Sequence, residues 1–315
     1  MGKRIVVVGS INLDLVAATP RIPIAGETVA GLNFRTFPGG KGANQAVAAA
    51  RLGGLVSMLG KVGTDIFGGQ LRESLEESKV DCNAVGIARG SSGVALISTD
   101  VSGQNAIIVV PGANASLSPA DIDQNMGLIR SAGILLTQLE IPLETVEYLA
   151  EIAAHDRIPL VLDPAPGRSL PASLLKRVDW LTPNETETSV LRGRQPGELS
   201  GESIEDSANA LVEAGSKNVI LKLGDRGCYV ALSDGTRQLL PAYSVKATDT
   251  TAAGDAFNGA FAVALLNGLD PLESAAWASA VAAISVTRHG AQPSMPSAIE
   301  VERFLEDRRT AKSSS

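Results

Sequence analysis

The 315-residue sequence has few aromatic residues, few cysteines and no excess of positive charge. Phe, Trp and Tyr make up 3% of the chain against 44% for all hydrophobic residues, so its core must consist mainly of Ala, Val, Leu and Ile. Aliphatic cores of this kind are typical of parallel sheets buried beneath helices. The formal net charge of −7 argues against a basic surface for nucleic acid or anionic lipid.

Long apolar runs and cysteine pairs are also missing. The two cysteines, Cys82 and Cys228, are too few for a disulfide scaffold and do not form a metal-ligand pair. The apolar run at the start of the chain is shorter than a signal-peptide core or a membrane span. We therefore expect a cytoplasmic protein with reduced thiols and no membrane or nucleic-acid partner.

Strand-like and helix-like segments alternate along most of the chain. The β-branched run Ile5–Val8 predicts a buried first strand, and the Ala-rich segment 42–52 predicts a helix that stops at Gly53. Further strand-like runs lie at 134–139, 160–162, 180–181 and 219–223. The alternation predicts a layered α/β fold, although the length alone does not distinguish one large domain from two.

Two stretches interrupt this alternation. Residues 12–38 contain Pro20, Pro23 and Gly26 between short β-like pieces, and residues 93–110 contain two aliphatic runs joined by the polar turn DVSGQN, as in a β-hairpin. Neither stretch has a partner helix, so we expect them to form a small sheet that projects as a lid. Residues 310–315 are expected to be a disordered tail.

The strongest candidate site is the segment DTTAAGD, residues 249–255, followed by a long apolar helix that begins near Ala253. Amide N–H groups at a helix start bind phosphate, and the helix dipole favours the anion. Asp255 in the first turn could accept a proton from an attacking hydroxyl. The alternative is an Asp that only stabilises the start of the helix.

Two polar segments lie nearer the amino terminus. GGKGAN, residues 39–44, is a glycine-rich entry to a helix but lacks the spacing of a phosphate-binding P-loop. Asn12 and Asp14 follow the first strand, where such a pair could hold vicinal sugar hydroxyls. The alternative for this pair is a turn stabilised by local hydrogen bonds.

Three other candidates follow strands later in the chain. Asn184 and Glu187 lie three residues apart at a helix start and could reach a phosphate and a hydrated Mg²⁺, but helix capping explains them equally well. Residues 222–227 form a tight turn between strand-like runs. Glu140 follows the strand-like run 134–139, where ligands of open α/β sheets bind.

Taken together, these motifs resemble the ribokinase family, the PfkB-type carbohydrate kinases. The resemblance extends over nearly the whole chain, and its two signatures are GGKGANQAVAAARLG and DTTAAGDAFNGA. Between the signatures, and in the family's order, come QLE at 138–140, DPAP at 163–166, TPNETE at 182–187 and KLGDRG at 222–227.

The resemblance implies a single three-layer α/β domain over residues 1–315, a mostly parallel central sheet, and a small β lid through which two copies dimerise. It also implies transfer of the ATP γ-phosphoryl group to the 5-hydroxyl of D-ribose, with Asp255 as catalytic base. The implied sugar site comprises Asn12, Asp14, Gly40, Lys41, Gly42, Ala43, Asn44, Glu140 and Asp255. The implied ATP site comprises Asn184, Lys222, Leu223, Gly224, Asp225, Arg226, Gly227, Gly254, Asp255 and Ser279.

The resemblance further implies K⁺ beside the 249–255 segment and Mg²⁺ held through water by Glu187. The positions implied for K⁺ are Asp249, Thr251, Ser285, Arg288, Gly290 and Ser294, several through backbone carbonyls. The chain departs from the family pattern at Lys222, where many relatives carry Thr, at Ser279, where His or Asn is common, and at Ala252, which replaces Gly.

Two other functions remain open on the sequence. One is a kinase for 2-deoxyribose or another free sugar, which a comparison of kcat/KM between sugars would reveal. The other is a non-catalytic sugar-binding regulator that kept the fold. The presence of Asp255, Gly254, Lys41 and Asn44 argues against the regulator.

Overall fold

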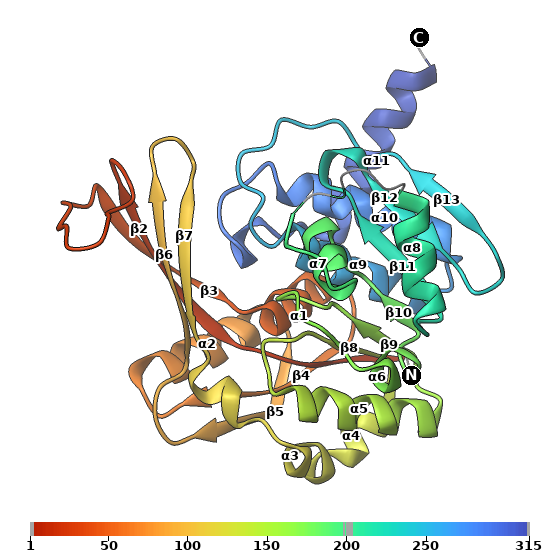
Figure 1. Cartoon of the computed structure of the whole chain (residues 1–315), viewed down its shortest axis with the longest axis horizontal. Helices are drawn as coiled ribbons and strands as arrows, with labels where there is room; N and C mark the ends of the chain where they lie inside the picture. Colours follow the sequence, from red (N-terminus) through yellow and green to blue (C-terminus); the bar gives the residue numbers. More distant parts are fainter. Residues whose placement is uncertain (1–2, 198, 200–203, 314–315) are drawn as a thin grey trace.

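The computed structural model describes residues 3–197, 199 and 204–313. Over these residues the chain forms a large sheet with helices on both faces and a smaller sheet that projects to one side (Figure 1). The three-layer α/β fold with a second small sheet, predicted from the sequence, is confirmed.

Most of the large sheet is parallel. Its strands are β1 (Arg4–Val8), β4 (Val56–Gly63), β5 (Asp81–Ala88), β8 (Ala132–Thr137), β9 (Leu160–Leu162), β10 (Trp180–Leu181), β11 (Asn218–Lys222), β12 (Cys228–Ala231) and β13 (Arg237–Leu240). Among the described residues they follow the order β13-β12-β11-β10-β9-β8-β1-β4-β5, and only β12 and β13 run antiparallel to their neighbours. The carboxyl ends of the parallel strands therefore meet at one edge, the usual place for a ligand.

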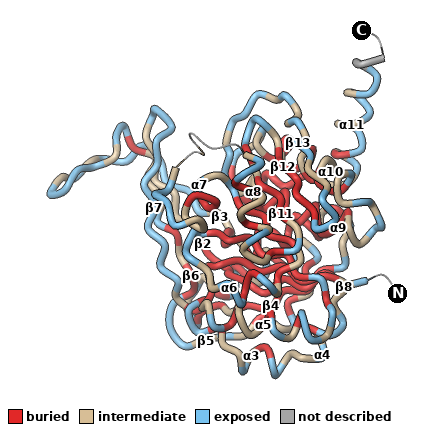
Figure 2. Tube along the Cα trace, turned by 45° about the vertical axis from the view of Figure 1, so that its right-hand side comes forward, coloured by how far each residue is buried: buried red, intermediate tan, exposed pale blue. Residues whose placement is uncertain are grey.

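The small sheet is built from two segments of the chain that are far apart in sequence. Its strands are β2 (Asn12–Thr19), β3 (Asn33–Gly39), β6 (Gly93–Asp100) and β7 (Asn105–Val110), in the order β3-β2-β6-β7. Strand β2 follows β1 almost directly, so the small sheet grows out of the carboxyl edge of the large one. Much of its surface is exposed, in contrast to the buried central strands (Figure 2).

The helices divide into two layers. On one face of the large sheet lie α1 (Lys41–Arg51), α2 (Ile66–Glu77), α9 (Ala253–Leu266), α10 (Pro271–Ser285) and α11 (Ala298–Ser313). On the other lie α3 (Pro119–Gln124), α4 (Met126–Arg130), α5 (Leu143–Asp156), α6 (Ala172–Leu175), α7 (Glu185–Leu191) and α8 (Ile204–Glu213). Short 3₁₀ turns cover Gly112–Ser116, Gly224–Arg226 and Gln292–Ser294.

Two hydrophobic cores separate these layers. Strand β1 contributes to both, because Ile5 and Val7 face the core of α1 and α9 while Val6 and Val8 face the core of α5. This alternation follows from the two-residue period of a strand. All four side chains are at most 1% exposed, which accounts for the unbroken aliphatic run in the sequence.

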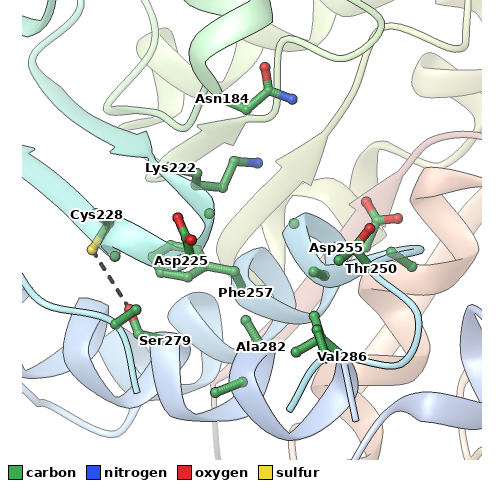
Figure 3. A pocket seen from close by; sticks show the side chains of 18 of the residues that line it. Asn184, Lys222, Asp225, Cys228, Thr250, Asp255, Phe257, Ser279, Ala282 and Val286 are labelled. Carbon is green, nitrogen blue, oxygen red and sulfur yellow. Dashed lines mark hydrogen bonds between the residues drawn. The ribbon is translucent and has the colours of Figure 1, made fainter. Parts of the chain in front are cut away.

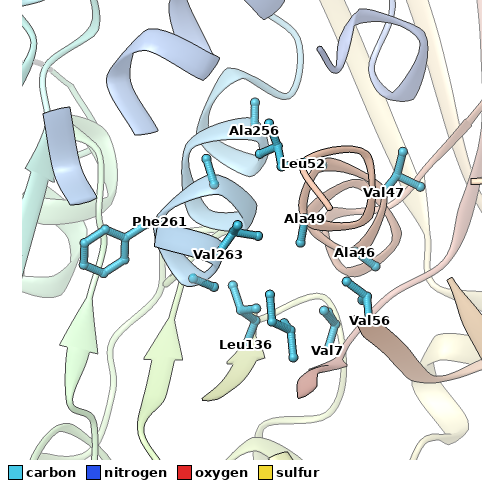
Figure 4. Packing of buried hydrophobic residues seen from close by; sticks show 14 of the residues in the cluster. Val7, Ala46, Val47, Ala49, Leu52, Val56, Leu136, Ala256, Phe261 and Val263 are labelled. Atoms are coloured by element: carbon cyan, nitrogen blue, oxygen red, sulfur yellow. The ribbon is translucent and has the colours of Figure 1, made fainter. Parts of the chain in front are cut away.

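Helices α1 and α9 pack closely against each other over the sheet (Figure 4). A Cβ at Gly259 would lie only 2.6 Å from the carbonyl oxygen of Gln45, so glycine is needed for this approach. Ala46, Ala49 and Ala256 fill the contact with small side chains. The packing brings the first turns of both helices to the carboxyl edge of the sheet.

The prediction of a disordered tail from residue 310 is wrong for residues 310–313, since α11 continues to Ser313. Arg308, one turn earlier, lies over the Phe304 ring and donates to the Ser244 carbonyl, which ties this end of the helix to the domain. Residues 314–315 lie outside the described part. Among the described helices, none combines the length and the apolar character of a membrane span.

Candidate active site

A cavity of about 790 Å³ opens at the carboxyl edge of the parallel strands (Figure 3). Its walls come from the ends of β9, β10 and β11, from the segment 242–247, and from α9 and α10. Predicted site residues that line it are Lys41, Asn184, Glu187, Lys222, Gly224, Asp225, Gly227, Gly254, Asp255 and Ser279. Segments separated by more than two hundred residues thus meet in one cavity.

Asp255 lies in the first turn of α9 at the bottom of this cavity. Its carboxylate is 4% exposed and accepts hydrogen bonds from Asn44 Nδ2 at 3.0 Å and Gln45 Nε2 at 3.1 Å. Burial raises the pKa of Asp255, while the charge of Lys41 opposes that rise. The residue therefore has the environment of a proton acceptor rather than of a solvated helix-capping Asp.

The start of α9 is preceded by an unusual backbone conformation. Ala252, at the N-cap, has φ 59, in the left-handed region that favours glycine. Its alanine side chain is the family departure noted in the sequence, and the fold accommodates it there. The Ala253 amide donates to the Thr250 carbonyl at 3.3 Å, and the next amide, that of Gly254, lies at the cavity wall, where a helix start offers a donor to an anion.

The glycine-rich segment before α1 packs tightly on the end of β1. Gly40 has φ +86, and a Cβ there would lie 2.7 Å from the backbone nitrogen of Asn12. The amides of Gly42 and Ala43 donate to Ser10 Oγ at 3.3 Å and to the Ser10 carbonyl at 2.9 Å. Glycine and alanine thus serve close packing, and this packing directs Asn44 toward Asp255.

Lys41 opens α1 and lies among carboxylates. Burial would lower its pKa, but the charges of Asp255, Asp163 and Glu140 outweigh burial and raise it above the ordinary range. The Lys41 amide donates to Glu140 Oε2 at 3.1 Å. Lys41 is therefore a permanent cation in contact with both halves of the site.

Asn12, Asp14 and Glu140 form the side of the site nearest the small sheet. Glu140 accepts a 2.6 Å hydrogen bond from Ser10 Oγ, and Asn12 Oδ1 accepts one of 2.7 Å from Asn114 Nδ2. Burial, followed by the charges of Glu140 and Asp255, raises the pKa of Asp14 to about 7. Asp14 therefore lies near enough to Glu140 and Asp255 for their charges to act on it.

The predicted nucleotide residues divide between the cavity wall and its support. Asn184 and Glu187 form a capping box at the start of α7, with Asn184 N donating to Glu187 Oε2 and Glu187 N to Asn184 Oδ1, each at 2.8 Å. Helix capping is thus present, and both residues also line the cavity. Leu223 and Arg226 do not line it, because Leu223 is in the core and Arg226 pairs with Glu185.

Sequence reasoning missed Gln45 and Asp163. Gln45 Nε2 donates to Asp163 Oδ2 at 3.0 Å as well as to Asp255, and Asp163 Oδ1 pairs with Lys222 Nζ at 3.0 Å. Gln138 Nε2 in turn donates to Gln45 Oε1 at 2.7 Å. All lie within motifs already noted, GGKGANQ, DPAP and QLE, but their connection depends on contacts distant in sequence.

Three of the predicted cation residues, Asp249, Thr251 and Gly290, are joined where the loop before α9 meets the loop after α10, while Ser285 ends α10. The amides of Thr248 and Asp249 donate to the Val286 carbonyl, and Asp249 accepts from the amides of Thr251 and Gly290, each at 2.9 Å. Ser285 and Ser294 donate their hydroxyls to nearby carbonyls, which leaves their oxygens as acceptors. The Arg288 guanidinium pairs with Glu300, so only its backbone is available to a cation.

The K⁺ and Mg²⁺ ions that the family resemblance implies would find different donors in this structure. Asp249 and the surrounding carbonyls offer the oxygen donors that a hard cation requires. Asp163, Glu187, Asp225 and Asp255 bring four carboxylates to the cavity. No group of three or more His, Cys, Asp or Glu suited to a metal occurs within residues 3–197, 199 and 204–313. Carboxylates at the cavity wall are the donors that a hydrated Mg²⁺ would use, since Mg²⁺ usually keeps several of its waters.

A family model described as pfkB family carbohydrate kinase matches residues 2–298. The chain belongs to the pfkB carbohydrate kinase family. Among curated pfkB relatives, a ribokinase of Haemophilus influenzae is 39% identical over 307 residues, which cover 97% of this chain and 99% of that protein. A deoxyribokinase of Salmonella typhi is 38% identical over 303 residues, covering 96% and 98%.

The pfkB fold is equally clear in solved structures. The structure of Arabidopsis thaliana ribokinase complexed with ribose and ATP matches with a TM-score of 0.90 and 34% sequence identity, covering 97% of this chain and 99% of that one. The agreement covers the small sheet, the large sheet and both helix layers together.

Proposed function

We propose that this pfkB-family protein transfers the γ-phosphoryl group of ATP to the 5-hydroxyl of D-ribose. The observation that carries the proposal is the position of Asp255, buried between the acids near the small sheet and the cavity lined by β11 and α9. Ribokinases such as the Haemophilus and Arabidopsis proteins support ribose as the sugar.

The proposed chemistry depends on position and charge. Asp255 accepts the proton of the 5-hydroxyl while the hydroxyl oxygen attacks the γ-phosphorus and the bond to the β-phosphate oxygen breaks. The first amides of α9 face the charge that develops on the phosphoryl oxygens. Asn44 and Gln45 fix the carboxylate, each by a hydrogen bond of about 3 Å.

The sugar and nucleotide roles follow from the two sides of the site. Asn12, Asp14, Lys41 and Glu140 are proposed to hold the sugar hydroxyls, and the wall formed by Asn184, residues 222–227 and Ser279 to hold ATP. Closure of the small sheet over the sugar would keep water from the phosphoryl group. A Mg²⁺ ion held through water by Glu187 would neutralise phosphate charge.

We also propose a K⁺ site at Asp249, Thr251, Ser285, Arg288, Gly290 and Ser294. Its support is the convergence of two oxygen-rich loops next to the anion-binding start of α9. A cation there would neutralise Asp249 and stabilise the turn that presents the Gly254 amide.

The small sheet is proposed to serve a second purpose, as the contact between two copies of the chain. Phe34 and Ile108, each 63% exposed, lie with Leu96 on the face of the sheet opposite Asp14. An apolar face of this kind is suited to self-association. A cytoplasmic location, expected from the two free cysteines, fits a kinase that draws on ATP.

A kinase for 2-deoxyribose is the second candidate, because the Salmonella deoxyribokinase is nearly as similar to this chain as the ribokinases are. A pocket built to bind the 2-hydroxyl should penalise its absence, since a buried polar group would lose its partner. ADP release measured with ribose, 2-deoxyribose and other free sugars separates the candidates. A higher kcat/KM for 2-deoxyribose would replace ribose in the proposal.

Asp255→Asn tests the base directly. We expect kcat for ribose to fall by about 10²- to 10⁴-fold, because a general base contributes about that much. Ribose affinity in calorimetry should change little, since the amide keeps the shape and a hydrogen-bonding oxygen. Asp307→Asn on the exposed surface of α11 is the control. Near-parental turnover in Asp255→Asn would exclude the residue as base. If the parent protein releases ADP with none of the sugars, the non-catalytic sugar-binding regulator would be favoured.

A further inference from the structure

Lys222 belongs to the proposed ATP wall, but that assignment gives no role to the charge of its side chain. Lys222 ends β11, and its side chain is 14% exposed and extends into the cavity (Figure 3). A Cβ at Gly254 would lie 3.1 Å from Lys222 Nζ. The ammonium group therefore stands beside the first amides of α9, where the proposed mechanism places the terminal phosphate.

A buried partner fixes this ammonium group. Asp163 is 2% exposed, accepts from Lys222 Nζ at 3.0 Å, and accepts from Gln45 Nε2 at 3.0 Å through its other oxygen. The same Gln45 nitrogen donates to Asp255. One continuous set of contacts thus connects the proposed base with a lysine on the opposite wall of the site.

The charges of the site require such a cation. Asp163, Glu187 and Asp255 all line the cavity that would receive the polyanionic nucleotide. Lys41, the other lysine of the lining, lies among Asp255, Asp163 and Glu140 and contacts Glu140 through its amide. Of these two lysines, Lys222 lies on the wall proposed to hold ATP, and its ammonium group lies at the start of α9.

We propose that Lys222 is a further catalytic residue, whose ammonium group binds the terminal phosphoryl group of ATP during transfer and is positioned by Asp163. This inference rests on the proposed kinase function. During the step the sugar oxygen bonds to the γ-phosphorus, the bond to the bridging oxygen breaks, ADP leaves with the electron pair, and Asp255 receives the proton. Lys222 transfers no proton and stabilises the charge on the phosphoryl oxygens.

Lys222→Met tests the proposal, because methionine keeps an unbranched side chain and removes the charge. We expect kcat to fall by about 10²-fold or more, the usual effect of removing one preorganised donor. We also expect affinity for the non-hydrolysable analogue adenylyl imidodiphosphate to fall by about tenfold, while affinity for ADP stays close to parental. Titration calorimetry measures both ligands without turnover. Equal losses for the analogue and ADP would overturn the assignment to the terminal phosphate.

Removing Lys222 alone leaves Asp163 as a buried charge without its ion-pair partner, which destabilises proteins. The variant Asp163→Asn/Lys222→Met removes both charges and keeps an oxygen that can accept from Gln45. We expect this variant to unfold at a temperature near the parental one and to remain as slow as Lys222→Met. Recovery of parental kcat in the double variant would show that the single variant suffers from the unpaired Asp163, and would overturn the proposal.

Lys217→Met is the matched control, because Lys217 precedes the same strand and pairs with Asp179 at the exposed end. Its kcat and nucleotide affinities should equal those of the parent. Parental kcat in a folded Lys222→Met variant would also overturn the proposal. If the parent phosphorylates no sugar, the kinase function fails, whereas the difference between the analogue and ADP still tests the Lys222 contact by itself.

Discussion

Asp14 shows how the structure changes the chemistry of a single residue. Its carboxyl group is partly buried on the first strand of the small sheet, close to Glu140 and Asp255, and its pKa is raised from 3.8 to about 7. The folded protein therefore holds the Asp14 proton more tightly than the unfolded chain does. Ionisation of this group makes folding less favourable as the pH rises from 3.8 towards 7.

Ribose binding should show the opposite pH dependence. In the proposed sugar site, an ionised Asp14 would accept hydrogen bonds from sugar hydroxyls, whereas the protonated group would lose one of these acceptor positions. With a pKa of about 7, the ionised fraction of Asp14 is about tenfold smaller at pH 6 than at pH 8. The Kd for ribose should therefore be about tenfold larger at pH 6 than at pH 8. Calorimetry without nucleotide measures this ratio.

Asp14→Asn is the control for this titration. The variant should bind ribose more weakly at pH 8 and lose the part of the pH dependence that belongs to Asp14. Any dependence that remains belongs to other groups, among them Asp255, whose pKa burial also raises. Identical pH profiles in parent and variant would contradict the role of Asp14.

For single residues, the sequence identifies candidate site residues better than it predicts the contacts between them. Asp255, Asn44 and Lys41 could be singled out because each lies in a short motif at a helix start. Gln45 and Asp163 could not, because their importance arises from bonds that join positions 45, 163 and 255. Leu223 shows the converse case, since the side chain of a residue inside a motif can pack in the core.

At the scale of elements, the start of α9 depends on the loops on either side of it. Asp249 accepts from the Gly290 amide, and the Val286 carbonyl accepts from the amides of Thr248 and Asp249, so the two loops are held together by backbone groups. Burial opposes ionisation of Asp249, but hydrogen bonds from Thr251 and Gly290 lower its pKa. The loops thus present a stable negative charge next to the turn before α9, where the proposed mechanism places a phosphate.

This arrangement leads us to expect stimulation by K⁺. Turnover measured in K⁺ should exceed turnover in tetramethylammonium at the same ionic strength, because the organic cation is too large to be enclosed by the carbonyls of two loops. Asp249→Asn should reduce the difference between the two salts. Equal rates in both salts for the parent would remove the K⁺ site from the proposal.

The sequence predicts most elements because their patterns are local. Aliphatic runs, glycine stops and the 93–110 hairpin correspond to buried strands, helix ends and the β6–β7 pair. The end of the chain was mispredicted, because the polar run after residue 309 has no local helix signal. Helix α11 continues there after Arg308 contacts Phe304 and Ser244, and those contacts are not visible in local composition.

At the scale of the whole molecule, the small sheet presents different residues on its two faces. Strand register places Asn12 and Asp14 on one face, and Phe34, Leu96 and Ile108 on the other. Self-association through the face of Phe34, Leu96 and Ile108 would leave the face of Asn12 and Asp14 over the sugar site. Two copies could therefore join without blocking either site.

Ile108→Glu should convert a dimer into monomers, because it buries a charge in the proposed interface. Ile107→Glu is the matched control, since Ile107 is the neighbouring residue, is also exposed, and lies on the opposite face. Sedimentation velocity of the parent and both variants measures the mass. A monomeric parent, or a dimer that survives Ile108→Glu, would contradict association through this face.

The position of β2 has a mechanical consequence. This strand carries Asn12 and Asp14 at its root and extends to Thr19 at the far end of the small sheet, hydrogen-bonded to β3 on one side and β6 on the other. A ribbon braced along both edges transmits a tilt at its tip to its root. If the sugar binds at the root of β2 as proposed, the inclination of the projecting sheet should change with sugar occupancy, so a label at the sheet's tip should report binding at the base of the strand.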